Sequence, residues 1–229
     1  MNRQLKTGLV IVSIVLLLSP VASAQNLLKY RDFEFGMSLE AVLKQTKMSA
    51  ASARTIYAVP DLIQTLEWSK QGYFASQGET DPVQTLRFDF YNNQLFKITA
   101  TYNTRQLEGM TQADLIDAIS KVYGSASSPD VTIAISLYSG IEIQQKVLAR
   151  WDNEENIFSL FRFYADGQFG LIGSSKTLDG KAAQSIQEGA RLAALAAPQQ
   201  EIERRQKLAE ERRAQDEKAR NVNAPNFRP

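Results

Sequence analysis

Three acidic side chains follow Trp151 closely: Asp152, Glu154 and Glu155. Two carboxylates at a suitable separation can act as general acid and general base. With Asn153, Asp152 and Glu155 could instead offer oxygen ligands to a hard cation, although their spacing does not match an EF-hand loop. Acids in a polar turn are more often solvated connection residues, so carboxylate catalysis is the least favoured function for this chain.

Most other catalytic chemistries are excluded by composition, because the 229 residues include no cysteine and no histidine. This removes Cys and His nucleophiles and bases, zinc and haem sites built on those ligands, and disulfides. The chain also lacks the G-x-S-x-G, S-x-x-K and P-loop patterns. Gly167, Gly170 and Gly173 fall in an expected strand pair rather than in a phosphate-binding turn. The sequence therefore predicts a non-enzymatic protein with no cofactor and no metal.

Two aromatic residues stand out as candidate partner-binding residues. Tyr73 and Phe74 lie between Gly72 and Ser76, in a polar segment expected to link two strands. Aromatic side chains on a polar loop are effective contact residues in protein interfaces. The alternative is that they fold back and cover the sheet.

The charge balance argues against nucleic acid as a partner. The chain has 26 Lys and Arg against 25 Asp and Glu, a formal net charge of +1. Proteins that bind nucleic acid generally show a basic surplus on one face.

Residues 1–24 have the pattern of a secretory signal peptide. A basic segment containing Arg3 and Lys6 precedes an apolar run over residues 8–18, and Ala22-Ser23-Ala24 offers small residues for cleavage. The apolar run is shorter than the roughly 20 residues that a membrane-spanning helix needs. We expect a periplasmic or secreted protein with no stable membrane span after cleavage; an uncleaved N-terminal anchor is the alternative.

An internal repeat organises the rest of the chain. Gly36-Met37-Ser38 recurs as Gly109-Met110-Thr111, and residues 88–91 (FDFY) recur as 161–164 (FRFY), both shifted by 73 positions. An equal offset favours duplication of one module. We expect a first module over residues 25–106 and a second over residues 107–176.

Each module is expected to begin with a helix. Ser38 and Thr111 are favourable N-cap residues, Asp114 completes a capping-box pattern, and Gly124 is suited to end the second helix. A further helix is considered over residues 50–57.

Antiparallel strands are expected to follow each helix. Apolar and polar residues alternate over residues 86–90 and 96–102, and strands are also expected to end near Trp68 and Trp151. A three-residue loop over residues 92–94 would pair Phe90 with Phe96, Phe88 with Ile98 and Asp89 with Lys97. Turn residues 166–167 separate strands expected over 158–164 and 168–173, and residues 131–137 are a weaker strand candidate. The fold class is α+β, with two tandem modules of helix on antiparallel meander.

This arrangement resembles two known protein families. Gly-Met-Ser/Thr opening a helix, a strand carrying Trp, and an aromatic hairpin resemble the BamE/SmpA outer-membrane assembly lipoprotein module. The tandem copy resembles the β-lactamase-inhibitor-protein fold. The resemblance covers about residues 33–174 and implies a fold and a habit of binding envelope proteins. BamE-like proteins carry a lipidated cysteine and generally one module, whereas this chain has no cysteine.

A charged helical arm is expected over residues 177–220. Small and apolar residues recur with helical spacing at 182, 186, 190, 193 and 197, before Pro198. Acid-before-base pairs such as Glu201–Arg205 support the remainder, where apolar residues are too few for a heptad seam. The arm is either a solvated, coiled-coil-like helix or a docking element, and residues 221–229 are expected to be a disordered tail.

The favoured function is therefore an exported, non-enzymatic protein-interaction module of the cell envelope. Its partner would be another envelope or secreted protein, bound through the solvent face or edge of the sheets and the 71–81 loop. The first alternative is a proteinaceous inhibitor or modulator of an extracellular hydrolase, and the second is a carboxylate-dependent enzyme.

Overall fold

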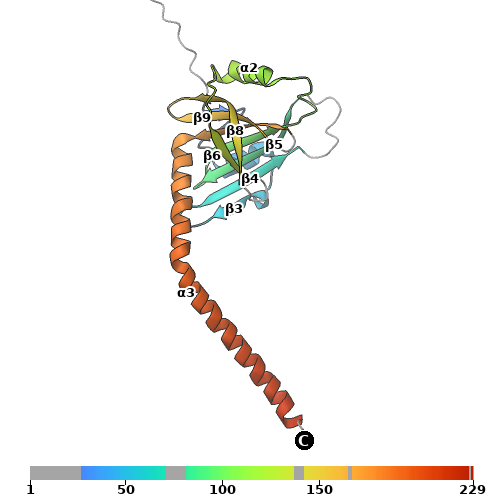
Figure 1. The fold of residues 1–229 in the computed structure, drawn as a ribbon, viewed down its shortest axis with the longest axis vertical. Coiled ribbons are helices and arrows are strands. Elements are labelled where there is room, and N and C mark those ends of the chain that lie inside the picture. The colour runs from blue at the N-terminus through green and yellow to red at the C-terminus, as the bar shows by residue number, and fades with distance from the viewer. Residues whose placement is uncertain (1–26, 71–80, 137–141, 165–166, 227, 229) are drawn as a thin grey trace, which may run out of the picture.

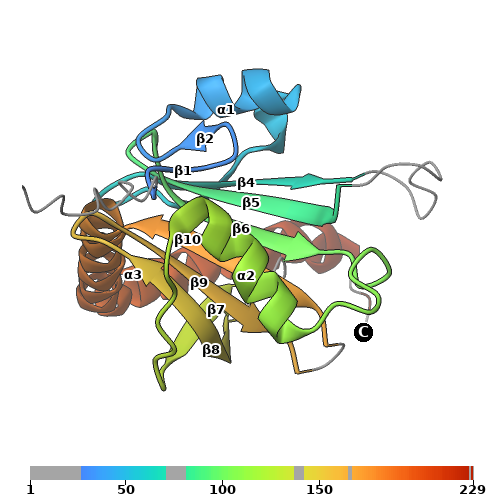
Figure 2. The ribbon, with the colours of Figure 1, turned by 90° about the horizontal axis from the view of Figure 1, so that it is seen from above.

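The computed structural model describes residues 27–70, 81–136, 142–164, 167–226 and 228, so the predicted signal peptide lies outside the described residues. Its centre is one antiparallel sheet of eight strands (Figures 1 and 2). In spatial order these strands are β3 (Arg54–Tyr57), β4 (Ile63–Ser69), β5 (Val83–Tyr91), β6 (Gln94–Tyr102), β10 (Phe169–Ser175), β9 (Asn156–Arg162), β8 (Glu142–Asp152) and β7 (Thr132–Ser136). The predicted α+β class is confirmed.

The remaining elements are a small two-stranded sheet, three helices and two 3-10 turns. They are β1 (Lys29–Tyr30), β2 (Phe33–Glu34), α1 (Leu39–Thr46), α2 (Gln112–Tyr123), α3 (Lys176–Asn223), η1 (Ala50–Ser52) and η2 (Ala224–Asn226). The large sheet consists of two four-stranded meanders, β3 to β6 and β7 to β10, joined where β6 pairs with β10. The regions predicted as separate modules thus contribute to one continuous sheet.

The predicted helix starts are confirmed. Ser38 accepts a hydrogen bond from the Ala41 amide at 3.2 Å, and Thr111 forms a complete capping box with Asp114. Such bonds satisfy amides that have no partner within the helix. Gly124, with φ of 84°, caps the end of α2.

The helix considered over residues 50–57 is not formed. Ser49 caps η1, and the chain then enters the edge strand β3. The sequence Thr55-Ile56-Tyr57 consists of β-branched and aromatic residues, which favour a strand where a neighbouring strand is available. Strand β4 supplies that neighbour.

The β5–β6 hairpin has a shorter turn than predicted. Asn92 and Asn93 both have positive φ, 46° and 65°, as in a two-residue type I′ turn. Phe90 therefore pairs with Leu95, so the predicted three-residue loop and the Phe90–Phe96 pair are wrong.

A β-bulge restores the rest of the predicted register. Moving away from the turn, the register shifts by one residue between the Phe90–Leu95 pair and the Asp89–Lys97 pair. From there on, Asp89 pairs with Lys97 and Phe88 with Ile98, as predicted. The extra residue of the bulge is Phe96, which packs against α3 together with Ile63 and Ala182.

The aromatic repeat does not place its members equivalently. Phe88 lies in the large core on the α1–α2 side of the sheet. A Cβ added to Gly173 would meet the ring of Phe158, which belongs to the same core, whereas a Cβ added to Gly170 would meet the ring of Phe161. Residues three apart in a strand face opposite sides, so Phe161 points to the other face of the sheet.

The large core joins both meanders to α1 and α2. Trp151 is fully buried, and its indole N–H donates to Ser120 Oγ and to the Gly124 carbonyl, both at 3.1 Å. Phe158 stacks on Tyr123 with ring centroids 4.4 Å apart. Aromatic side chains of β8 and β9 thereby hold α2 against the second meander.

Helix α3 packs on the opposite face and then leaves the sheet (Figure 1). Leu178, Ala182 and Ile186 pack beside Phe96, and Asp179 forms an ion pair with Lys97 at 2.7 Å. Beyond Pro198 the helix is exposed, with Glu201 bound to Arg204 and Arg205.

The structure differs from the expected disordered tail at residues 221–226. Helix α3 continues to Asn223, and Ala224–Asn226 form η2, where Asn226 Nδ2 donates to the Val222 carbonyl. Of the helices in the described part of the chain, none combines the length and apolarity that crossing a bilayer requires.

Candidate functional site

The candidate site is the face of the large sheet opposite α1 and α2, which we call the polar face. Side chains alternate along each strand, so the residues between those of the large core point to this face. Its polar members are Thr65, Glu67, Thr85, Arg87, Asp89, Lys97, Thr99, Thr101, Arg150, Ser159 and Ser174. They come from six adjacent strands; Thr65, Asp89, Thr99, Ser159 and Ser174 are buried, and the other six are partly buried.

Cross-strand pairing arranges these residues in rows. The central row runs through Glu67, Arg87, Thr99, Ile172, Ser159 and Arg150, each paired with the next across neighbouring strands. Directly opposed side chains lie about 4.5–5.5 Å apart at Cβ. The row therefore crosses the sheet from β4 to β8, with one apolar residue among hydroxyl and charged groups.

Internal contacts fix several of these polar groups. Arg87 Nε lies 3.0 Å from Asp89 Oδ1, and both side chains are largely buried. Thr85 and Thr101 share a hydrogen bond of 2.6 Å between their hydroxyls. Such contacts reduce the conformational freedom that a partner would otherwise have to restrict.

Two polar atoms on this face have hydrogen-bonding capacity left over. Thr65 Oγ1 and Arg150 Nε are buried and find no hydrogen-bond partner within the described residues. Burial also raises the pKa of Glu67 above its ordinary value, against the opposing effect of Arg87 and Arg54. Of these three residues, Glu67 and Arg150 are partly exposed, so a partner can reach them, whereas Thr65 is buried.

Helix α3 covers one end of the polar face. Ile63 and Phe96 are buried beneath Ala182 there, and Lys97 is engaged by Asp179. The predicted Asp89–Lys97 register is formed, but the two side chains do not form an ion pair with each other. Asp89 pairs with Arg87, and Lys97 pairs with Asp179, the carboxylate that α3 brings to it.

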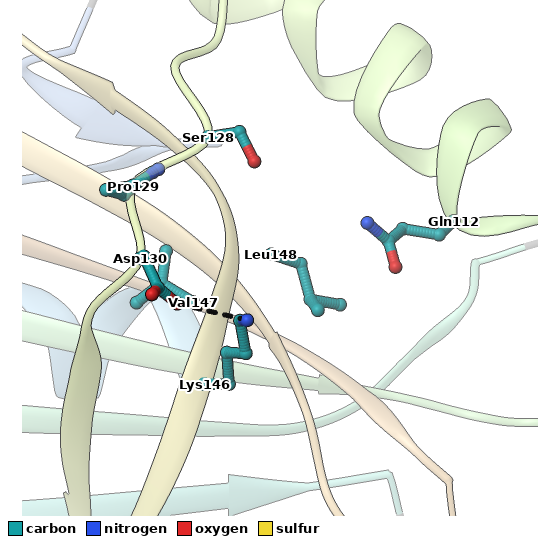
Figure 3. A pocket seen from close by; sticks show the side chains of 7 residues that line it. All are labelled: Gln112, Ser128, Pro129, Asp130, Lys146, Val147 and Leu148. Carbon is teal, nitrogen blue, oxygen red and sulfur yellow. Dashed lines mark ion pairs between the residues drawn. The ribbon is translucent and has the colours of Figure 1, made fainter.

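A separate open pocket lies between the start of α2 and β8 (Figure 3). Its volume is about 560 Å³, and its lining residues are Gln112, Ser128, Pro129, Asp130, Lys146, Val147 and Leu148. Lys146 and Asp130 form an exposed ion pair of 3.1 Å, which contributes little to stability. The pocket can hydrogen-bond a small polar group, and nothing in the sequence analysis pointed to it.

The predicted contact residues Tyr73 and Phe74 lie outside the described residues, but the base of their loop is described. Arg31 donates to both carboxylate oxygens of Asp81 at 2.7 and 2.6 Å, and Lys70 Nζ donates to the Asp81 carbonyl at 3.1 Å. The two chain positions that flank residues 71–80 are therefore held together and tied to the turn after β1.

Removing the Arg31 guanidinium should make stability less dependent on acid pH. That guanidinium lowers the pKa of Asp81 below its ordinary value of 3.8, so the pair stabilises the fold fully above that pH. As the pH falls through the lowered pKa, the stabilisation is lost. Urea unfolding should show Arg31→Gln less stable than wild type at pH 6, with a difference that narrows below about pH 4.

The exposed Arg213→Gln provides the control for this comparison, since its expected effect on stability is small at every pH. A difference between wild type and Arg31→Gln that widened on acidification would contradict the proposed role of the pair.

The predicted acids after Trp151 form the β8–β9 turn. Asp152, Glu154 and Glu155 are all exposed, and Asp152 lies 3.2 Å from Lys176 Nζ. Asn153 Oδ1 accepts from the amides of Glu155 and Asn156. No group of three acidic side chains placed to hold a cation occurs within the ranges that the structure describes. These contacts tie the turn to the start of α3.

The chain matches no protein-family model, no curated protein and no solved structure. Its functional assignment therefore depends on its own geometry.

The sequence indicated part of the polar face and missed the rest. The alternation of Arg87, Asp89, Lys97 and Thr99 with apolar residues predicted an outer polar surface on the first meander. Arg150 and Ser159 join it only through the β6–β10 and β9–β10 pairings. No local pattern indicates which strands from distant parts of a chain will be neighbours.

Proposed function

We propose that this chain is an exported, non-enzymatic protein that binds another envelope or secreted protein through its polar face. The observation that carries the proposal is the set of hydroxyl and charged groups on six adjacent strands, of which Glu67, Thr85, Arg87, Lys97, Thr101 and Arg150 keep part of their surface accessible. A broad surface with prearranged polar groups suits recognition of a partner surface.

Two features of the sequence support the export and non-enzymatic parts of the proposal. Residues 1–24 carry the signal-peptide pattern, and the chain has no histidine or cysteine to act as nucleophile or base. The exposed position of the acids after Trp151 gives carboxylate catalysis no enclosed site at that turn.

We further propose that the two meanders derive from one duplicated module. Gly36 and Gly109 both have positive φ and both precede the N-cap of a helix by two residues. Val42 and Leu115, at the same offset of 73, are both buried in the large core. The FDFY and FRFY motifs give no support, because Phe88 and Phe161 point to opposite faces.

A charge placed on the polar face should abolish partner binding. Thr101 lies partly buried on this face, whereas Thr104 is exposed in the turn after β6. We expect Thr101→Arg to lose a protein that the wild type captures from an envelope fraction, and the matched Thr104→Arg to retain it. A long cationic side chain prevents close approach at the first position only.

Equal recovery of the partner by both variants would contradict the proposed surface, and recovery of no envelope protein by any of the three would contradict the proposed function. Circular dichroism and urea unfolding of both variants serve as the control for folding.

The alternative of hydrolase inhibition remains a prediction without a specific observation in its favour. It requires aromatic side chains exposed on one sheet face; Phe96 and Phe161, which point to the polar face, are buried, and Tyr57 at the β3 edge is 39% exposed. Inhibition of any member of a panel of purified hydrolases at micromolar protein would favour it.

A further inference from the structure

Strand β3 leaves one edge of the large sheet open. It pairs only with β4, through Arg54–Thr65, Thr55–Gln64 and Tyr57–Ile63, and it is the last strand of the sheet among the residues that the structure describes. Alternate N–H and C=O groups of an edge strand point away from its neighbour and can accept a further strand.

Large apolar side chains are exposed along this edge. Ile56 and Tyr57 of β3 are 45% and 39% exposed, and Val59, in the loop that joins β3 to β4, is 64% exposed. Natural edge strands are usually protected by short length, β-bulges, charged residues, prolines or covering segments. Strand β3 has four residues, a register shift between Thr55 and Tyr57, and Arg54 as its one charged residue, so its edge is partly protected, while its apolar side chains stay exposed.

Helix α3 extends beyond β3 above the position that a further strand would occupy. A Cβ added to Gly189 would lie 2.7 Å from the carbonyl of Val59, so α3 contacts the loop that joins β3 to β4 at this residue. Leu192, Ala193 and Ala196 follow on the same side of the helix as Gly189. Figure 1 shows α3 continuing past β3 away from the rest of the sheet.

The apolar part of α3 that extends past β3 is long enough to cover added strands. A helix rises about 1.5 Å per residue and strands lie about 4.8 Å apart, so about three helical residues correspond to each strand. The side of α3 facing the sheet stays apolar from Gly189 to Ala196 and becomes polar at Gln200. It therefore extends over the width of about two more strands.

We propose that an extended segment of another protein, with apolar residues at alternate positions, adds to β3 as a ninth strand beneath α3. The open edge would supply main-chain hydrogen bonds, and Ile56 with the Leu192–Ala196 side of α3 would select the apolar side chains. The inference adds a partner chemistry to the proposed binding function and uses the edge of β3, which adjoins the polar face.

A second copy of this chain fits the same position less well. Antiparallel pairing of two β3 strands would reverse the second copy, because Tyr57 lies at the α3 end of β3 and Arg54 at the other end. The charged Arg54 and Glu67 of that copy would then face the apolar side of α3, which is unfavourable.

Strand addition can be tested with purified mature protein and a synthetic probe. The probe is a fluorescent eight-residue peptide of alternating valine and threonine with lysine at both ends, which keeps it soluble. We expect saturable binding by fluorescence anisotropy. Two control peptides carry N-methyl groups, one at the odd positions and one at the even positions. Only alternate amides of an added strand donate to β3, so at least one of the two peptides should fail to bind.

Two variants locate the binding position. Ile56→Lys should weaken peptide binding by about tenfold or more, because it adds a charge to the edge. Ala193→Glu should weaken it similarly, whereas Ala194→Glu, which changes a neighbouring exposed alanine on another side of α3, should not.

The inference is overturned by any of three results: no saturable binding, binding unaffected by both Ile56→Lys and Ala193→Glu, or a wild-type dimer that Ile56→Lys converts to monomer. The third result would assign the edge to a second copy. Because these variants leave the polar face unchanged, failure here does not affect the Thr101→Arg test, and failure of that test does not affect this one.

Discussion

Gly173→Ala is expected to destabilise the protein severely, by about 3 kcal/mol, although it adds a single methyl group. The new Cβ would overlap the ring of Phe158. That ring is fully buried and stacked on Tyr123, so it has no space into which to move. Urea unfolding monitored by circular dichroism measures the loss.

Gly180→Ala is the matched control, because a Cβ at this exposed position in α3 meets nothing within 4 Å. Alanine is a better helix former than glycine by about 0.8–1 kcal/mol, so this variant should be slightly more stable than wild type. Similar stability of the two variants would contradict the packing described between β9 and β10.

Trp151→Ala is expected to lower the free energy of unfolding by about 3–5 kcal/mol. The side chain is fully buried, and its loss would leave a cavity between β8 and α2. It would also leave the Gly124 carbonyl and Ser120 hydroxyl without the indole donor. Urea unfolding of this variant, with Trp68 as the remaining fluorescent reporter, provides the measurement.

Trp68→Ala is the comparison, because Trp68 is half-buried at the periphery of the same core and should cost less stability. The sequence treats the two tryptophans as equivalent, since each marks the end of a strand. An equal loss of stability in the two variants would contradict the central position assigned to Trp151.

Features governed by local chemistry could be predicted from the sequence. Ser38, Thr111 and Gly124 act within a few residues of their own position, by supplying a hydrogen bond or a positive φ. The alternation around Phe88 and Ile98 likewise reports which side of a strand is buried. These signals correctly predicted the positions of α1 and α2. They also predicted that β4, β5 and β6, and likewise β8, β9 and β10, follow one another as antiparallel neighbours.

Features governed by distant parts of the chain could not be predicted in the same way. The bulge at Phe96 places an aromatic ring under α3, which begins 80 residues later at Lys176. Phe161 matches Phe88 in its local sequence, yet a one-residue difference in strand register sends it to the other face. Pairing between distant strands decides both cases.

The candidate site shows the same division. The polar residues of β5 and β6 were visible as an alternating pattern, whereas Arg150 and Ser159 reach the polar face through the tertiary pairing of β8, β9 and β10. The edge of β3 was not anticipated, because residues 50–57 were considered helical. Its exposure depends on which strand ends the sheet, and the local sequence carries no signal for that.

Cysteine labelling in cells tests the proposed binding face most directly. The chain has no cysteine, so Thr101→Cys and Thr104→Cys each introduce a single thiol. The proposal predicts that a maleimide labels both purified variants, but in intact cell envelopes labels Thr101→Cys far less than Thr104→Cys. Labelling of Thr101→Cys to the same extent in envelopes and in the purified protein would contradict occupation of the polar face by a partner.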